Sequence, residues 1–295
     1  MRTDRRQFLA AIPGALLAAC TARSTARSLA STPAPSPDDD LASAQGAARF
    51  IRAHAVATPH GLTWHKSPDE PITTGLDLYH GSAGPALFLL ELHRATGEQA
   101  ALDEALAGAA HIAASWKDPA PRWEIGLFGG FAGHAGLFAA LARDSRDPRI
   151  AGWLDTAIEG MARAAEPVEG GGVAYAANDM LYGNAGVILT LLELPGDKPR
   201  ALAVALGDGL LAHAQAVPDG TRWLMSPDDK SEYPNFSHGT AGVAYALARL
   251  YEVTRDRRYL DAALGGARHL VAIAHTAGGV CLVPHILPEG AESVA

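Results

Sequence analysis

The motif Gly-x-Ala-Gly occurs four times in this chain, each time at the start of an apolar stretch. The four copies read GSAG, GFAG, GNAG and GTAG, and their first glycines are Gly81, Gly130, Gly183 and Gly239. Successive first glycines are 49, 53 and 56 residues apart. A period near fifty is typical of an array of similar supersecondary units. We therefore expect the chain to fold as a series of repeats.

Each repeat is expected to contain two helices, because Ala and Leu are abundant and β-branched residues are sparse. The first helices are expected at residues 41–57, 98–116, 148–165, 199–216 and 257–276, and the second at 83–96, 132–143, 185–194 and 241–254. The second helices are apolar on much of their circumference and should be inner, whereas the first carry charge on one face and should be outer. This alternation predicts an all-α fold, an incomplete α/α toroid of about four and a half helical hairpins, with helix 257–276 unpaired.

The motif glycines are expected to act at the start of each inner helix. There they should let neighbouring inner helices approach closely and should tolerate the turn that reverses the chain. Free N–H groups and positive helix-dipole ends should then gather at one mouth of the ring.

Charge and composition limit the partners. The chain has 48% hydrophobic and 19% charged residues, which is a globular profile, and its formal net charge is −8. No Lys/Arg cluster recurs on a helical face, so no nucleic-acid partner is expected.

The N-terminus, residues 1–19, is predicted to be a signal peptide of the twin-arginine, lipoprotein type. Arg5 and Arg6 precede an apolar run, Phe8–Ala19, that is too short to span a bilayer. The sequence LAAC that ends at Cys20 resembles a lipobox, so we expect Cys20 to be lipidated. An ordinary amphipathic helix is the alternative. The signal predicts export and a periplasmic or cell-envelope lipoprotein, held at the membrane by its lipid.

Residues 20–40 should form a disordered tether, because they are rich in Ser, Pro and Ala. The folded domain is expected to cover residues 41–295.

Two stretches of the chain resemble the Gly-rich repeats of the lanthionine synthetase C-like family. They are SHGTAG, which AYALARLYEVTRDRRYLDAA follows closely, and GLFGGFAG, and the resemblance extends over about residues 41–290. It implies a toroid of seven helical hairpins with a central zinc held by two Cys and one His. In the family the zinc activates a substrate Cys thiolate, which adds to a dehydrated Ser or Thr of a peptide and closes a thioether ring.

The zinc ligands implied by the resemblance have no counterpart here. The sequence contains neither Trp-Cys-x-Gly nor Cys-His-Gly and ends at Ala295, so the toroid is expected to stop before the zinc-ligand repeats. In CLVPH, Cys281 and His285 offer two donors, but Pro284 argues against a helix and two ligands do not make a zinc site. We expect no metal or other cofactor in this chain, and therefore no cyclase activity on its own.

Candidate chemical groups precede the motif glycines. Four positions before them stand Asp77, Gly126, Asp179 and Asn235, and one position before them stand His80, Gly129, Tyr182 and His238. The resemblance implies acid/base roles for Asp179 and His238, acting on a peptide substrate. Their alternative roles are a helix cap for Asp179 and a buried, hydrogen-bonded group for His238. His80 is expected to be a packing or hydrogen-bonding histidine.

Other functions remain open at this stage. A carbohydrate-active α/α toroid would use Asp77 and Asp179 as paired carboxylates, although none of the 5 Trp directly precedes a motif. An exported, non-catalytic binding scaffold is a third possibility. The edge beside helix 257–276 should expose apolar surface and favour self-association.

Overall fold

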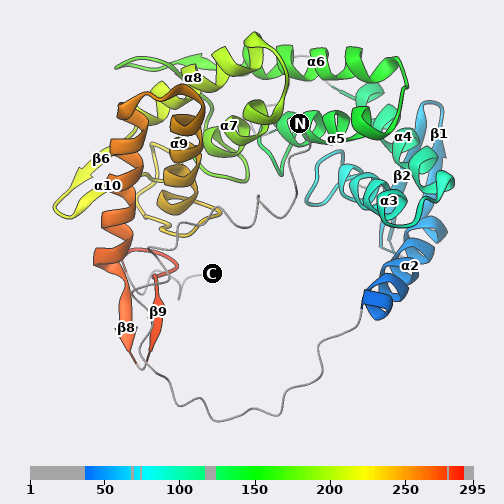
Figure 1. Cartoon of the computed structure of the whole chain (residues 1–295), viewed down its shortest axis with the longest axis horizontal. Helices are drawn as coiled ribbons and strands as arrows, with labels where there is room; N and C mark the ends of the chain where they lie inside the picture. The colour runs from blue at the N-terminus through cyan, green and yellow to red at the C-terminus, as the bar shows by residue number, and fades with distance from the viewer. Residues whose placement is uncertain (1–36, 68–69, 74, 117–123, 278, 289–295) are drawn as a thin grey trace.

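The computed structural model describes residues 37–67, 70–73, 75–116, 124–277 and 279–288. The predicted signal segment, Cys20 and the tether up to residue 36 lie outside the described residues. Figure 1 shows an arc of inner and outer helices, which confirms the predicted fold class. None of the described helices is long and apolar enough to cross a membrane.

The helices alternate between the inside and the outside of the arc. The inner helices are α3 (Ala83–Thr96), α5 (Phe131–Asp144), α7 (Asn184–Glu193) and α9 (Thr240–Thr254), and the outer helices are α4 (Gln99–Ala114), α6 (Arg149–Ala164), α8 (Asp197–Ala212) and α10 (Arg257–Ile273). Each inner helix packs most extensively on the outer helix that follows it. The expectation that helix 257–276 lacks an inner partner was therefore wrong, because α10 packs on α9. The helix without such a partner among those described is α2 (Pro37–Ala53).

Helix α2 begins four residues earlier than predicted. Pro37 opens it, so residues 37–40 of the expected tether are helical. Proline suits a first helical turn because its φ is already fixed near the helical value. Asp39 and Asp40 follow, and carboxylates near a helix N-terminus interact favourably with the dipole.

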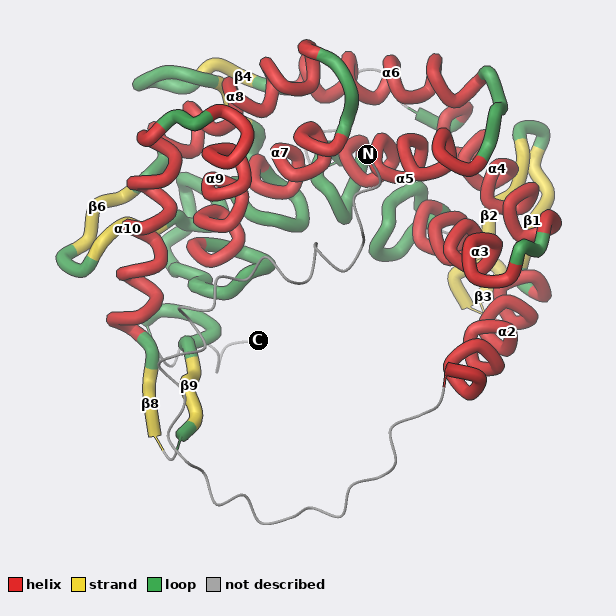
Figure 2. The backbone as a smooth tube through the Cα atoms, in the orientation of Figure 1, coloured by secondary structure: helices red, strands yellow, loops and turns green. Residues whose placement is uncertain are grey.

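Antiparallel strands follow helices α2, α6, α8 and α10 (Figure 2), as a three-stranded sheet after α2 and a two-stranded sheet after each of the other three helices. The sequence did not reveal them, because all except β2 are only two to four residues long. They are β1 (Ala55–Thr58), β2 (Gly61–Ser67) and β3 (Glu70–Thr73), then β4 (Glu166–Pro167) with β5 (Val173–Ala174), β6 (Gln215–Val217) with β7 (Gly220–Arg222), and β8 (His275–Ala277) with β9 (Val280–Leu282). β2 packs on α4, β5 on α8 and β7 on α10. Each of these strands therefore covers the outer helix of the next repeat.

Two of these strands are equivalent in detail. A Cβ at Gly108 of α4 would lie 2.8 Å from Cη2 of Trp64 in β2, and one at Gly266 of α10 would lie 3.1 Å from Cζ3 of Trp223, which follows β7. Both indoles are buried. The glycines thus leave room for one large aromatic ring in each repeat.

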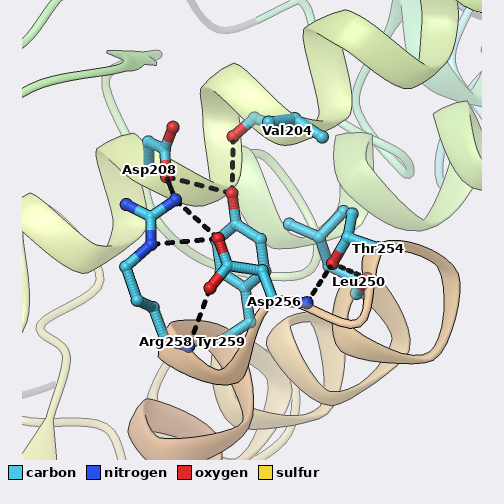
Figure 3. A network of polar contacts seen from close by, with 7 residues as sticks. All are labelled: Val204, Asp208, Leu250, Thr254, Asp256, Arg258 and Tyr259. Carbon is cyan, nitrogen blue, oxygen red and sulfur yellow. Dashed lines mark hydrogen bonds and ion pairs between the residues drawn. The ribbon is translucent and has the colours of Figure 1, made fainter.

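The turn between α9 and α10 is fixed by polar contacts (Figure 3). Asp256 caps α10 by accepting from Arg258 N at 2.9 Å. The hydroxyl of Tyr259 donates to Val204 O at 3.2 Å and contacts Asp208 Oδ1 at 3.0 Å. Burial raises the pKa of Tyr259, so the phenol stays protonated. The last helix pair is thereby held on α8.

Candidate functional site

The motif glycines lie against the backbone of their own loops. A Cβ at Gly239 would lie 1.9 Å from Tyr233 O, and one at Gly242 would lie 2.1 Å from Phe236 O. None of the eight motif glycines has a positive φ. The expectation of a reversing turn that needs glycine was therefore wrong, because the space is needed for the loop that folds back on the helix. Close approach between repeats contributes in part, since a Cβ at Gly186 would lie 2.9 Å from Cβ of Leu127.

Backbone hydrogen bonds connect the four motif loops in series. Tyr79 N donates to Phe128 O at 3.3 Å, Phe128 N to Leu181 O at 2.9 Å, and Met180 N to Ser237 O at 3.0 Å. Each loop therefore touches the loop of the next repeat. This places residues from successive motifs side by side at one end of the inner helices.

The residue four positions before the first glycine caps its own loop in three repeats. Oδ1 of Asp77 accepts from His80 N at 2.6 Å, Oδ1 of Asp179 from Tyr182 N at 2.9 Å, and Oδ1 of Asn235 from His238 N at 2.9 Å. The capping role considered for Asp179 is thus present in the structure. It uses only one of the two carboxylate oxygens.

The second oxygen of Asp179 pairs with His238. Oδ2 lies 3.0 Å from His238 Nδ1, with the Asp179 side chain fully buried and the His238 side chain 30% exposed. Burial raises the pKa of Asp179, and hydrogen bonds from Tyr182 N and His238 oppose this rise. The described residues hold no hydrogen-bond partner of His238 Nε2. The two residues named by the resemblance therefore form a carboxylate–imidazole pair whose second nitrogen is open to a ligand.

An aromatic cluster lies beside this pair, and sequence reasoning missed it. The ring of Tyr233 lies 6.1 Å from the ring of His238 and 6.1 Å from that of His285, edge-on in both cases. The CLVPH segment thus places His285 near His238. It does not assemble a set of metal ligands there among the described residues.

A buried carboxylate supports the loop that carries His238. Glu232 is 1% exposed, and its Oε1 contacts His269 Nε2 at 2.8 Å and accepts from Thr240 Oγ1 at 3.3 Å. Its backbone exchanges two hydrogen bonds with Leu287. A single Glu in a loop gives no sequence signal, so this anchor was not predicted.

The other candidate residues are not assembled into a site. His80 is exposed, with its ring edge-on to Tyr79 at 4.4 Å, so the expected packing role is limited to that contact. Cys281 is exposed on β9. Within the described residues, no three His, Cys, Asp or Glu side chains are grouped as a metal site requires. The donors present therefore do not fit the zinc that the resemblance implies, and a metal-free chain stays a prediction.

Linked loops at the ends of the inner helices define a helical toroid protein. A carboxylate–imidazole pair, Asp179 and His238, bridges two of these loops. The profile of the family described as lanthionine synthetase C-like protein matches residues 73–270. The chain belongs to this family, as the resemblance predicted.

Solved structures with low sequence identity share the fold. The GH76A alpha-1,6-mannanase from Salegentibacter sp. HEL1_6 has a TM-score of 0.55 and 15% identity over 82% of this chain and 73% of its own. An inactive variant of that enzyme in complex with alpha-1,6-mannotetrose has a TM-score of 0.54, with the same identity and coverage. No curated protein matches the sequence. At this identity the similarity establishes the α/α toroid fold alone.

Proposed function

We propose that the protein binds a peptide at the mouth of the helix arc and that His238, held by Asp179, transfers a proton to or from it. The observation that carries this proposal is the 3.0 Å contact between Asp179 Oδ2 and His238 Nδ1, with Nε2 left open. A buried carboxylate on Nδ1 fixes the orientation of the ring and favours the tautomer in which Nδ1 carries the proton. Nε2 is then the atom that meets a substrate.

Family membership supports thiol addition to a dehydrated residue as the reaction class. When a thiolate adds to a dehydrated residue, a sulfur–carbon bond forms at the β carbon and the π electrons move to an enolate. Protonated His238 would donate its Nε2 proton to the α carbon, and the neighbouring Asp179 would stabilise the imidazolium that precedes this step. The pair therefore serves the protonation half of thiol addition.

Activation of the thiol is a separate requirement. A free thiol has a pKa of about 8.5 and is mostly protonated at neutral pH. The described residues hold no group of three donors that would bind an activating metal. The proposal therefore covers addition of a thiolate that arrives ionised, and it does not include ring closure by this chain alone.

The carbohydrate alternative receives less support from the geometry. A glycosidase needs an acid and a base or nucleophile that face the sugar. Asp179 is fully buried with one oxygen on its own loop and the other on His238, and Asp77 accepts two N–H groups of its own loop. These contacts favour a role for the imidazole over a role for paired carboxylates.

The test supplies a peptide with one dehydroalanine and an aryl thiol that is already ionised at pH 7. We expect the protein to accelerate addition by roughly 100-fold and to give one configuration at the α carbon, because a fixed acid protonates one face. His238→Asn and Asp179→Asn should lose both effects. The matched control, His80→Asn, should keep them.

Three results would overturn the proposal. They are equal rates with and without protein, a racemic α carbon, and full activity in His238→Asn. Peptide binding without acceleration would instead support a non-catalytic scaffold.

A further inference from the structure

Each junction between successive motifs contains the same side-chain contact. The residue three positions before the first glycine of one motif covers the second glycine of the next motif, which begins the next inner helix. The three pairs are Leu78 on Gly133, Leu127 on Gly186 and Met180 on Gly242, and a Cβ on the glycine would lie 2.9, 2.9 and 3.4 Å, respectively, from the covering side chain. Because the glycine has no side chain, it forms a socket that the preceding loop fills.

The socket of the first motif is not covered in this way. Its second glycine is Gly84, and among the described residues a Cβ there would meet only the backbone of Leu78, in its own loop, within 4 Å. Gly84 lines a cavity of about 450 Å³ together with Tyr79 of the first loop and Phe50 of α2. A cavity of this size lies within the range of pockets that hold small ligands. The first inner helix therefore presents an open socket.

The covering residue of the fourth loop is exposed instead of buried in a socket. Phe236 stands three positions before Gly239, as Met180 stands three positions before Gly183. Met180 is 3% exposed, whereas Phe236 is 50% exposed and has its ring 5.6 Å from that of Tyr245 in α9. No inner helix follows α9 among the described elements. The fourth loop therefore presents an aromatic side chain without a socket.

The backbone hydrogen bonds between the loops leave the same two ends open. Their acceptors are Phe128 O, Leu181 O and Ser237 O, each two positions before the first glycine of its motif. The equivalent oxygen of the first loop, Tyr79 O, accepts no N–H group of another motif loop within the part of the chain that the structure describes. Figure 1 shows α3 at one end of the arc and α9 at the other. The two ends therefore carry complementary halves of one joint.

We propose that two copies of this chain associate head to tail, with Phe236 of each copy in the Gly84 socket of the other. The fourth loop of one copy then lies on the first loop of the other as successive loops lie on one another within a chain. Tyr79 and Phe50 line the socket and are 60% and 56% exposed, so the joint would bury three aromatic rings. Aromatic residues are enriched in protein interfaces for this reason.

The joint is an interface between two different surfaces of the same chain. Such an interface produces a closed ring when both ends of each arc are joined, so we expect a dimer. The self-association expected from the sequence is thereby assigned to the loop before α9 and to the first motif. The joint uses neither Asp179 nor His238, so it can fail without affecting the proton-transfer proposal.

Sedimentation of the full chain over a wide range of concentration tests the joint. We expect the mass to rise to that of two chains. Phe236→Ala should raise the dissociation constant about thirtyfold, as for an aromatic anchor at an interface. Phe50→Arg places a charge at the socket and should also weaken association. The control is Leu264→Ala, which removes a side chain 47% exposed on α10 and should leave association unchanged.

Mixing the two interface variants separates the joint from general stickiness. The Phe236→Ala chain keeps its socket, and the Phe50→Arg chain keeps Phe236, so one intact joint can form between them. The mixture should associate more tightly than either variant alone, as measured with a fluorophore on one of the two. A monomer at every concentration, unchanged association in both variants, or a mixture no tighter than the separate variants would overturn the proposal.

Discussion

The first and the last two motif loops contain the same residue types but differ in what those residues do. Asp77 and His80 stand in the first loop at the positions that Asp179 holds in the third and His238 in the fourth. Asp77 caps its own loop, and His80 is exposed. The Asp179–His238 pair forms because the loops of successive repeats touch. An aspartate of this kind can therefore form such a pair only when a histidine stands directly before the first glycine of the next motif. In the motif after Asp77, that position is occupied by Gly129.

The largest expected effect is a loss of stability when the first glycine of a motif, a feature that all the motif loops share, is replaced by alanine. Gly81→Ala and Gly239→Ala should each destabilise the fold by about 3 kcal/mol. A Cβ would lie 2.2 Å from Asp77 N in the first case and 1.9 Å from Tyr233 O in the second. Urea unfolding should show similar losses in the free energy of unfolding for the two variants, because both glycines pack against the backbone of their own loops.

Gly136→Ala is the control for these substitutions. Its Cβ would meet nothing within 4 Å, and the site is inside α5. Stability should rise by about 0.5–1 kcal/mol, the helix preference for Ala over Gly. If Gly81→Ala or Gly239→Ala behaved like this control, the account of the motif glycines would be wrong.

A smaller effect, a loss of stability at acidic pH, should arise at the first loop and not at the other loops. His134 of α5 is buried, accepts from Trp116 Nε1 at 3.0 Å and contacts Leu76 O in the first loop through Nε2 at 3.0 Å. Burial lowers its pKa to about 4 from the usual 6.5. The folded state keeps the ring neutral while the unfolded state binds a proton below pH 6.5, so stability is full above 6.5 and falls as the pH drops toward 4.

Urea unfolding between pH 4 and 7 measures this contribution. At pH 5 the loss due to His134 should be about 2 kcal/mol, 1.36 kcal/mol for each pH unit below 6.5. His134→Gln should flatten the pH dependence, and His80→Gln should not change it. If the slope of stability against pH were unchanged in His134→Gln, the assignment of this pH dependence to His134 would be wrong.

The sequence predicted the repeated and local features of this molecule and missed those that depend on contacts between repeats. Helix positions followed from the motif spacing and from the apolar pattern, and the bounds of α3 were met. The pairing order of the helices, the Asp179–His238 distance and the anchor at Glu232 depend on which loops touch.

The measurement that tests the central claim most directly is the long-range ¹H–¹⁵N NMR spectrum of the histidine side chains. The account predicts that neutral His238 carries its proton on Nδ1, bound to Asp179, and that Asp179→Asn removes this preference while the His80 signals stay unchanged. A His238 ring protonated on Nε2, or one with the same spectrum in Asp179→Asn, would contradict the proposed pair.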